Sequence, residues 1–551
     1  MHIKLDYSKK HIFIFFFIFF SSIYPQIVYE PIESKIYSFL DNLSSKGIIE
    51  LDDIITPYSR TYIASKLIDI KKNEKSLTTI QKEELDFFIK DFGLEIDMLD
   101  TTVQLDDFNY FGKDKYDRIR LLTYSDDLFK INISPILGYE YGSLKGESYL
   151  HRWNGLRFYG YLGTNIGFSF EFRDNMEKGE NLDWEKDLTR ETGVIRYPKS
   201  SNSFEYNEVR TNLSYNWNWG EISIGKDFME WGYGESGKLV LSNKAPSFPF
   251  IRLDIRPTDW LSFNYMHCWI SSDVVDSNEI YNTYFDNAKR IIYRDKYLAT
   301  HTLNIFPIEG LTISLGESIV YSDEIKIEYL IPLMFFRLAD HYRSRNNNSA
   351  GDNSQFYFSV SSRNHVKNTH LYSSLFIDEI TISGLFDKQK QRNQFGFTLG
   401  GSVFDLPFDN LKLTVEYTKI YPFVYEHYIP TQTYQSNSYE MGHWMGDNAD
   451  QIYGSLKYKF MRGLDIIIWG EYIRKGSEGI VDQQYEQPQP PFLFGYRKNH
   501  THFGVNVSYE ILHELFVRAR YQNTKISGAE EDGTLVDEKY STFTIALSYG
   551  L

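Results

Sequence analysis

Strict alternation of apolar and polar residues is the feature that most constrains this chain. Segments with a period of two recur from about residue 128 to the last residue. Residues 411–418, for example, alternate Leu, Leu, Val and Tyr with Lys, Thr, Glu and Thr. A period of two describes a strand with one apolar and one polar face. A soluble β-sandwich shares this pattern but seldom sustains it over such a length, so the alternation favours one large antiparallel β-barrel.

Aromatic residues are unusually frequent for a chain that is also rich in charge. The sequence contains 43 Tyr and 41 Phe, and aromatic residues make up 17% while charged residues make up 24%. A water-soluble protein has little use for so many aromatics outside its core. A transmembrane barrel does need such residues, because its outer face is apolar and is flanked by aromatic girdles. The composition therefore predicts an outer-membrane barrel with membrane lipid as a partner.

Short and long connections alternate between the predicted strands, as they do when periplasmic turns are short and outer loops are long. The short turns are Gly163–Asn165, Trp219–Gly220, Pro257–Asp259, Pro307–Gly310, Pro407–Asn410, Met461–Gly463 and Ile511–Glu514. The long connections are 175–203, 230–249, 271–294, 321–354, 421–451, 475–499 and 525–538. With two strands placed between 355 and 380, the count from residue 128 to 551 is 18 strands, within a barrel domain spanning 115–551. An even number places both chain ends on the periplasmic side.

The N-terminus has the features of a secretory signal peptide. Lys4, Lys9 and Lys10 precede a short apolar run over residues 11–20, and two serines follow that run. This order of basic, apolar and small residues predicts a signal peptide over residues 1–26, and a buried N-terminal helix is the alternative. The run is too short for a transmembrane helix, which needs about 20 apolar residues.

Residues 27–100 carry helical instead of strand periodicity. Apolar residues recur at helical spacing between 36 and 43, and Ser59 can cap a second helix. Thr78 and Gln81 form a capping-box pattern in front of a third helix. The segment predicts a small helical bundle, which the termini place in the periplasm.

Several motifs, in their order along the chain, resemble the Wzi family of capsule assembly proteins. Residues 231–249 read Trp-Gly-Tyr-Gly-Glu-Ser-Gly-Lys-Leu-Val-Leu-Ser-Asn-Lys-Ala-Pro-Ser-Phe-Pro, and residues 442–450 read Gly-His-Trp-Met-Gly-Asp-Asn-Ala-Asp. Glu416-Tyr417, which leads to Tyr421-Pro422, is similar as well, and the helical opening resembles Bacteroidetes-type members of the family. Lys244 departs from the pattern, where an Asn before Ala is expected.

This resemblance implies an 18-stranded barrel with a periplasmic helical bundle. It also implies a surface lectin that binds and anchors capsular polysaccharide or exopolysaccharide during capsule assembly. The polysaccharide export machinery is then a further expected partner.

A lectin requires flat aromatic faces for sugar rings and fixed polar groups for hydroxyls. In the outer loops, the predicted polysaccharide-binding residues are Trp184, Trp231, Tyr233, Tyr425, Tyr434, His443, Trp444, Asp447 and Asp450. The alternative for each aromatic residue is that it packs the loops over the barrel mouth. We expect the main sugar contacts in the loop 421–451.

Two other loops have a sequence that suggests a conformation. The glycines of 230–249 predict a folded loop tucked into the barrel. The apolar run Tyr329–Leu338 suits a short helix, an inward constriction or a misplaced strand.

Several classes of function are disfavoured. Cys268 is the only cysteine, which excludes an intramolecular disulfide framework and a cysteine metal cluster. The net charge of −16 argues against nucleic acid as a partner. Asp447 and Asp450 lack the spacing of a calcium loop, so we expect no metal and no cofactor. The histidines are scattered and none lies in a nucleophile motif, so we expect no enzyme activity.

A porin-like channel for small solutes or oligosaccharides is the main alternative, because barrels of this size can enclose an aqueous pore.

Overall fold

The computed structural model describes residues 27–550 except 101, 104, 285–287, 348–350, 381–386 and 388–392. The signal peptide predicted over residues 1–26 lies outside the described residues. Within them, every helix is too short or too polar to cross a membrane.

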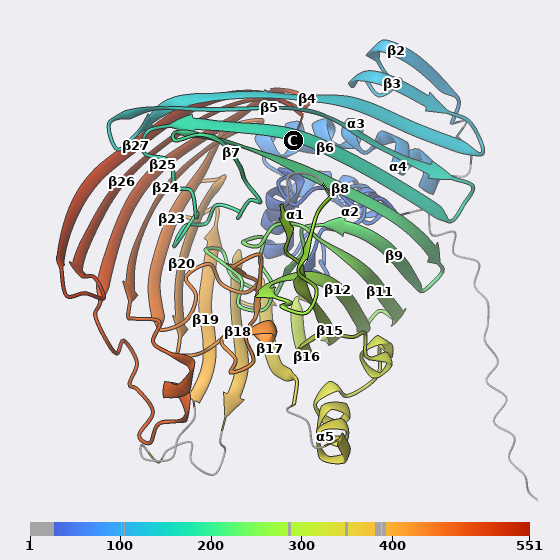
Figure 1. Ribbon diagram of the computed structural model, residues 1–551. Coiled ribbons are helices and arrows are strands. Elements are labelled where there is room, and N and C mark those ends of the chain that lie inside the picture. Colours follow the sequence, from blue (N-terminus) through green and yellow to red (C-terminus); the bar gives the residue numbers. More distant parts are fainter. Residues whose placement is uncertain are drawn as a thin grey trace, which may run out of the picture.

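Strands of the described chain form one closed antiparallel barrel (Figure 1). Closure is made by the last strand, which pairs with the first across the register Leu547↔Tyr139. The wall contains 18 strands, as predicted, including the two expected between 355 and 380. They are β4 (Phe129–Leu144), β5 (Glu147–Leu162), β6 (Ile166–Gly179), β8 (Ser203–Trp217), β9 (Gly220–Asp227), β11 (Phe248–Thr258), β12 (Leu261–Val275), β15 (Tyr293–Ile308), β16 (Leu311–Ser322), β17 (Asn353–Arg363), β18 (Thr369–Ile380), β19 (Asn393–Phe404), β20 (Leu411–Ile420), β23 (Ala449–Met461), β24 (Leu464–Lys475), β25 (Lys498–Leu512), β26 (Leu515–Ala529) and β27 (Leu535–Tyr549).

The alternation of the sequence separates the two faces of this wall. In β20, Thr414 and Glu416 are buried inside the barrel, whereas Leu413 and Val415 are exposed on its outer face. A closed barrel pairs every strand, so that its wall can lie in lipid with its backbone groups satisfied. The apolar outer face and the polar lumen are those of a transmembrane barrel.

The two ends of the barrel differ, and we call them the turn end and the loop end. At the turn end the strands are joined by tight turns, such as 309–310 and 462–463. Most connections at the loop end are long, although β4 and β5 are joined there by only residues 145–146. The loop-end connections contain β7 (Tyr197–Ser200), β10 (Glu230–Trp231), β13 (Tyr281–Asn282), β14 (Lys289–Arg290), β21 (Gln435–Ser436), β22 (Tyr439–Glu440), η2 (Ile327–Leu330), α5 (Phe336–Asn347), η4 (Pro430–Gln432) and η5 (Val481–Tyr485).

A hairpin of β2 (Asp107–Lys113) and β3 (Ile119–Ser125) precedes the barrel. Its second strand pairs with β4 through Leu122↔Ile133, on the same edge that β27 occupies further along β4. The hydroxyl of Tyr549 donates a hydrogen bond to the carbonyl of Ile119 at 3.1 Å. The hairpin therefore covers the part of the β4 edge that lies beyond the end of β27, which the sequence pattern did not indicate.

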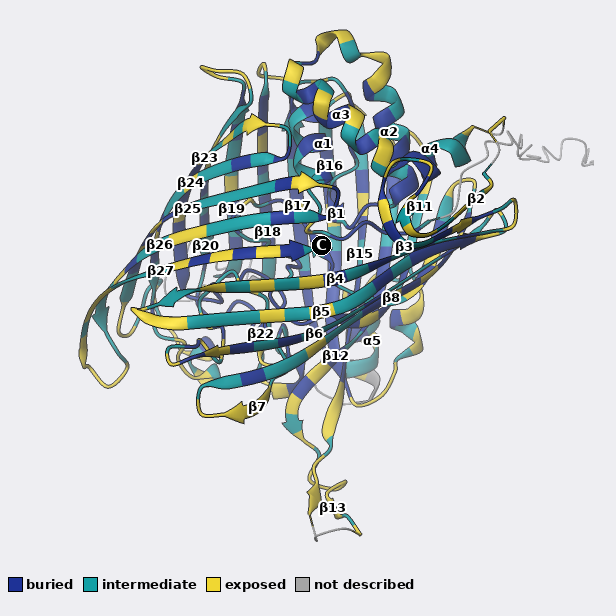
Figure 2. Cartoon of the chain, turned by 90° about the horizontal axis from the view of Figure 1, so that it is seen from above, coloured by how far each residue is buried: buried dark blue, intermediate teal, exposed yellow. Residues whose placement is uncertain are grey.

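The helical segment lies at the turn end (Figure 2). Its elements are α1 (Ile36–Ser45), β1 (Ile55–Thr56), α2 (Arg60–Lys72), η1 (Glu74–Ser76), α3 (Thr79–Asp91) and α4 (Gly93–Leu99). The Ser59 hydroxyl accepts the Tyr62 N–H, and Thr78 and Gln81 form the predicted capping box. These caps satisfy donors that the first helical turn leaves free. Apolar side chains of the three longer helices form a separate core, including Leu40, Leu67 and Leu85.

Candidate functional site

Three loops of the loop end fold back into the barrel, and we call residues 180–196, 228–247 and 421–448 the lumen plug. Glu416 of β20 points into the lumen and accepts the backbone N–H groups of Glu235 at 2.7 Å and Ser236 at 3.0 Å. Tyr372 donates its hydroxyl to the same carboxylate at 2.6 Å. Carboxylates that accept several hydrogen bonds hold their partners firmly. The loop 228–247 is thus tucked into the barrel, as its glycines predict.

The lumen plug meets the helical segment inside the barrel. Trp231 pairs with Ile55 in a short antiparallel ladder between β10 and β1. Next to it, the Gly232 N–H donates to the Ile54 carbonyl at 2.9 Å, and Gly232 has a φ of +101° that favours glycine. The Tyr233 hydroxyl donates to Asp53 at 2.7 Å. Contacts therefore run without interruption from the helices at the turn end to the plug.

Tyr425 and Tyr434 lie at the centre of the plug and are stacked, with ring centroids 5.7 Å apart. Their hydroxyls donate to the carbonyls of Leu239 at 2.8 Å and Val240 at 2.7 Å. Both rings are buried. They join the loop 421–448 to the loop 228–247, which is a packing role.

His443 and Trp444 make a second connection between these loops. The Trp444 indole N–H donates to the Ser236 carbonyl at 2.7 Å, and the His443 ring is stacked beside it. Gly237 lies so close to His443 that an added Cβ would stand 2.6 Å from Nε2. Burial, together with the nearby Arg190 cation, lowers the pKa of His443 to about 3, so the ring is neutral at ordinary pH.

Asp447 and Asp450 are both occupied by protein partners. Asp447 accepts the Phe423 N–H at 2.6 Å and lies 3.4 Å from the Lys475 ammonium. Asp450 accepts from the Arg474 Nε at 2.8 Å. In the part of the chain that the structure describes, no group of three or more His, Cys, Asp or Glu side chains is arranged to hold a metal ion.

Trp184 and Lys244 belong to the outer part of the plug. Trp184 is half-buried, and its ring packs 5.0 Å from that of Phe204. The Lys244 ammonium donates to the backbone carbonyls of Lys186, Thr189 at 3.0 Å and Glu191 at 2.9 Å. Lys244, the residue that departs from the family pattern, therefore holds the loop 180–196 in place. Burial lowers the pKa of Lys244 to about 8.

The predicted site residues are thus brought together, but mostly as buried residues of the plug. Of the nine, Trp184 alone is half-buried and the other eight are buried. A ring can stack on a sugar only where one of its faces is open. The eight buried residues can position neighbouring loops, while contact with a large polymer requires other side chains.

Two exposed tyrosines at the loop end offer such open faces. Tyr428 of the loop 421–448 is 46% exposed, and Tyr485 of the loop 476–497 is 47% exposed. Their ring centroids are 6.3 Å apart in an edge-to-face arrangement, and the His427 ring lies 4.4 Å from that of Tyr428. Tyr485 stands in no recognisable motif, so the sequence alone gave no reason to join it to Tyr428.

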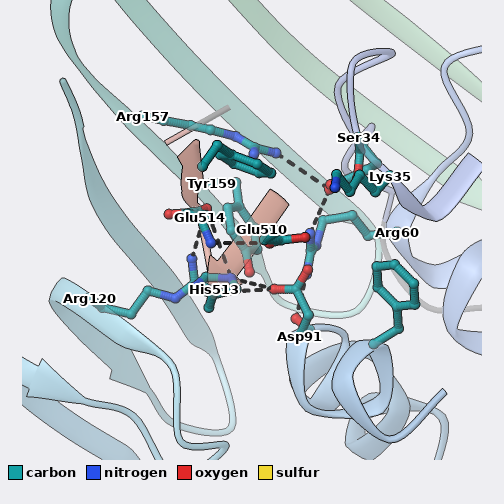
Figure 3. A pocket seen from close by; sticks show the side chains of 13 residues that line it. Ser34, Lys35, Arg60, Asp91, Arg120, Arg157, Tyr159, Glu510, His513 and Glu514 are labelled. Atoms are coloured by element: carbon teal, nitrogen blue, oxygen red, sulfur yellow. Dashed lines mark hydrogen bonds and ion pairs between the residues drawn. The ribbon is translucent and has the colours of Figure 1, made fainter. Parts of the chain in front are cut away.

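A buried network of charges attaches the helices to the turn end of the barrel (Figure 3). Arg60 of α2 forms ion pairs with Glu30 at 2.6 Å and Glu95 at 2.8 Å. Asp91 of α3 binds His513, in the turn between β25 and β26, at 2.7 Å. Burial alone raises the pKa of the Asp91 carboxyl, but His513 and the nearby arginines hold it well below its usual range. The network encloses a cavity of about 20 Å³, the size of one water molecule.

A larger cavity of about 270 Å³ lies between the helices and the turns of the turn end. Its lining includes Asp52, Tyr62, Lys66, Arg256 and Phe306. Burial raises the pKa of Asp52 to about 6, although Arg256 opposes this shift. The cavity presents charged and aromatic groups on the face opposite the long loops.

Comparisons with known proteins agree with this architecture. The family described as capsule assembly protein Wzi matches residues 154–536, which is more than half of the chain. No curated protein sequence gives a match. The solved structure of Wzi from Escherichia coli is similar over 96% of this chain and 100% of its own, with a TM-score of 0.56 and 12% identity. That protein is described as an outer-membrane protein involved in group 1 capsule assembly and as a carbohydrate-binding β-barrel.

Barrels from Pseudomonas aeruginosa are less similar. The structure of OpdK with vanillate has a TM-score of 0.43 and 10% identity, over 76% of this chain and 98% of its own. OprD has a TM-score of 0.42 and 12% identity, over 76% of this chain and 93% of its own. The closed barrel with its apolar outer face, and the family match over most of that barrel, lead to one assignment: this chain is an outer-membrane β-barrel that belongs to the Wzi family of capsule assembly proteins.

Proposed function

We propose that this protein binds capsular polysaccharide or exopolysaccharide and anchors it at the cell surface during capsule assembly, without catalysis. Membership of the Wzi family supports this role, as does the similarity in fold to a barrel described as carbohydrate-binding. The observation that carries the proposal is the pair of exposed rings, Tyr428 and Tyr485, which the loops 421–448 and 476–497 bring together at the loop end.

The orientation follows from the two ends of the barrel. Long loops belong outside the cell and short turns in the periplasm. The helices α1–α4 then lie in the periplasm, and both chain ends lie there too. We also place the chain with the Bacteroidetes-type members of the family, on the basis of its helical opening.

In the proposed site, the Tyr428 and Tyr485 rings contact the apolar faces of sugar rings, and hydroxyls of the polymer meet polar groups of the same loops. Eight of the nine predicted residues belong to the plug, and the ninth, Asp450, lies beside it at the start of β23. Tyr425, Tyr434, His443 and Trp444 hold the loop 421–448 in position, and Trp184 contributes the half-open face of its ring. A polymer repeats its sugars, so many barrels can hold one chain although each single contact is weak.

The porin-like alternative requires an open lumen. The plug and the helical segment meet inside the barrel through Trp231 and Ile55, which favours occlusion. Planar-bilayer recording tests this directly. We expect no stable openings of porin size, and such openings in the unmodified protein would favour a channel.

The polysaccharide export machinery is a proposed periplasmic partner. The cavity of about 270 Å³ at the turn end lies on the side where such a partner would approach. Crosslinking from a photoreactive residue at position 66, compared with one at exposed position 69 on the same helix, tests the contact. The absence of crosslinks to export proteins from both positions would contradict this contact.

The central experiment is a pull-down of capsular polysaccharide purified from the same cells. We expect Tyr428→Ala with Tyr485→Ala to lower retention of the polymer at least about tenfold, which corresponds to about 1.4 kcal/mol. Tyr281→Ala is the matched control, because Tyr281 is also an exposed loop tyrosine. Equal retention by the double variant and the control would reject this pair of rings. Normal cell-associated polymer in a deletion strain would reject the function itself.

A further inference from the structure

One part of the outer wall carries polar and ionisable residues where apolar residues are expected. Inward positions of β12 and β15 include Cys268 and Leu298, which belong to the lumen core. By alternation, His267 and His301 then face outward, as does Glu317 of β16, which is paired with His301. A carboxylate or imidazole that faces lipid without a partner raises the free energy of the barrel in the membrane.

The connection between β16 and β17, residues 323–352, covers this outward patch. Glu317 accepts the backbone N–H groups of Phe336 at 2.8 Å and Arg337 at 2.6 Å, at the start of α5. The Phe336 ring lies 4.5 Å from that of His301. Exposed fractions fall to 2% for Glu317 and 0% for Phe336. The N-terminus of a helix is a favourable place for a carboxylate.

Aromatic side chains complete the cover. Tyr329 of η2 packs on Tyr321 with ring centroids 4.9 Å apart, and it forms one buried cluster with the outward-facing Tyr265 and Tyr297. Phe335 lies 5.9 Å from Phe356 of β17, ring to ring. The connection therefore lies against the outer face of the wall. Of the alternatives that the apolar run allowed, the short helix is present, whereas an inward constriction and a strand are not.

The surface that this connection turns away from the barrel carries many large apolar side chains, beside the exposed Arg337 and His341. Leu333 is 82% exposed, Leu338 64% and Tyr342 74%. Other exposed large apolar side chains of the segment are Ile325, Ile327, Leu330, Ile331 and Phe335. Contiguous apolar surface of this kind marks a contact with another phase or molecule.

The position of the segment along the barrel wall indicates that this surface contacts lipid. Glu317 lies five positions before Ser322, the last residue of β16, so the start of α5 stands about 16 Å along the strand at about 3.3 Å per residue. Two residues nearer the turn end, the outer face of the wall exposes Leu303 of β15, Leu315 of β16 and Phe358 of β17, which are paired with one another. The apolar surface of the connection thus continues the lipid-facing surface of the wall, and α5 then runs on towards the loop end (Figure 1).

We propose that residues 325–342 form a membrane-embedded cover, which lies in the outer leaflet against β12, β15 and β16 and contacts the acyl chains of its lipids. The cover makes a polar stretch of the wall compatible with lipid. It anchors the barrel on one side by means of a loop, and this role is independent of sugar binding.

Spin-label accessibility in reconstituted bilayers tests the proposal. Cys268 is the only cysteine and is buried, so Cys268→Ser provides a background for single labelled sites. Labels are placed at Leu333→Cys and Leu338→Cys on the cover. Leu315→Cys on the bare lipid-facing wall is the lipid control, and Tyr281→Cys in an exposed loop is the water control. Collision with oxygen and with a water-soluble nickel chelate is measured by power saturation.

We expect the labels at 333 and 338 to match the lipid control, with high oxygen and low nickel accessibility. Behaviour like that of the label at 281 would overturn the proposal, because the segment would then face water. Protection from both reagents would also overturn it, because a second protein or a second copy would then cover the surface. Heat-modifiable gel mobility of each labelled protein verifies that the barrel is folded.

Discussion

Trp444 donates its indole N–H to the backbone carbonyl of Ser236 at 2.7 Å, although 208 residues separate the two along the chain. This bond joins the loop 421–448 to the loop 228–247 inside the lumen. Trp444→Phe removes the donor and leaves the buried Ser236 carbonyl without a partner, which should lower the free energy of unfolding by about 1–3 kcal/mol. Trp444→Ala adds the loss of a buried indole, and such truncations cost about 3–5 kcal/mol.

Because Tyr434 makes the parallel bond to Val240, the double variant Trp444→Ala with Tyr434→Ala is expected to free the loop 421–448 and to abolish polymer retention. Limited proteolysis and polysaccharide pull-down measure the two effects. Full polymer binding by a folded double variant would remove this loop from the proposed site. Trp219→Ala is the control, because Trp219 is an exposed indole in a turn of the turn end.

Glu416 holds the loop 228–247 through hydrogen bonds from two backbone N–H groups and the Ser236 hydroxyl, and it also accepts the hydroxyl of Tyr372 on β18. Glu416→Ala leaves these buried donors without their acceptor, and we expect part of the plug to leave its place. The measurement is planar-bilayer conductance, which should rise from a closed baseline to frequent openings. Glu324→Ala changes an exposed loop carboxylate and should leave the baseline unchanged. A closed Glu416→Ala barrel would show that this carboxylate does not hold the plug.

The ion pair between Asp91 and His513 predicts a dependence of stability on pH. The pKa of Asp91 is held below its ordinary value of 3.8, so the folded state binds its proton more weakly than the unfolded state. The contribution of Asp91 to the free energy of unfolding is therefore present above about pH 3.8 and is lost as the pH falls further. Asp91→Asn should lower the melting temperature of the helical segment at pH 7, and this difference should shrink towards pH 3. The exposed pair of Asp69 with Lys72 provides the control Asp69→Asn, which should change little. If Asp91→Asn lowers the melting temperature by the same amount at both pH values, protonation of the Asp91 carboxyl is not linked to stability.

Glu317 fixes the start of α5 on the outer wall. Glu317→Ala leaves the Phe336 and Arg337 N–H groups without their acceptor, at a cost of about 1–3 kcal/mol. In detergent, trypsin should then cut at Arg337, Arg343 or Arg345 about tenfold faster or more, because cleavage follows the population of the open loop. Glu324→Ala, which loses one exposed ion pair to Arg343, should cleave at nearly the unmodified rate. Unchanged cleavage after Glu317→Ala would mean that the aromatic contacts alone hold the segment.

Much of the fold can be predicted from the sequence because its signals are local. Alternation depends on neighbouring residues, so the wall, its count of strands and the division into lipid and lumen faces could be predicted. The caps at Ser59 and Thr78 depend on residues three positions apart, and both were predicted. The hairpin β2–β3 was not, since its exposed aromatic residues carry no sign that it would pair with β4.

The site depends on contacts between distant residues, which local patterns do not contain. An aromatic residue in a loop has the same sequence signal whether it faces sugar or packs on another loop. Only the folded chain places Tyr425 and Trp444 against the loop 228–247 and leaves Tyr428 beside Tyr485. The composition of the apolar run at 329–338 left a helix, a constriction and a strand open, because its place outside the barrel depends on Glu317 and on rings from several strands. Periodicity decides which faces a strand has, whereas the packing of loops decides which of those faces are covered.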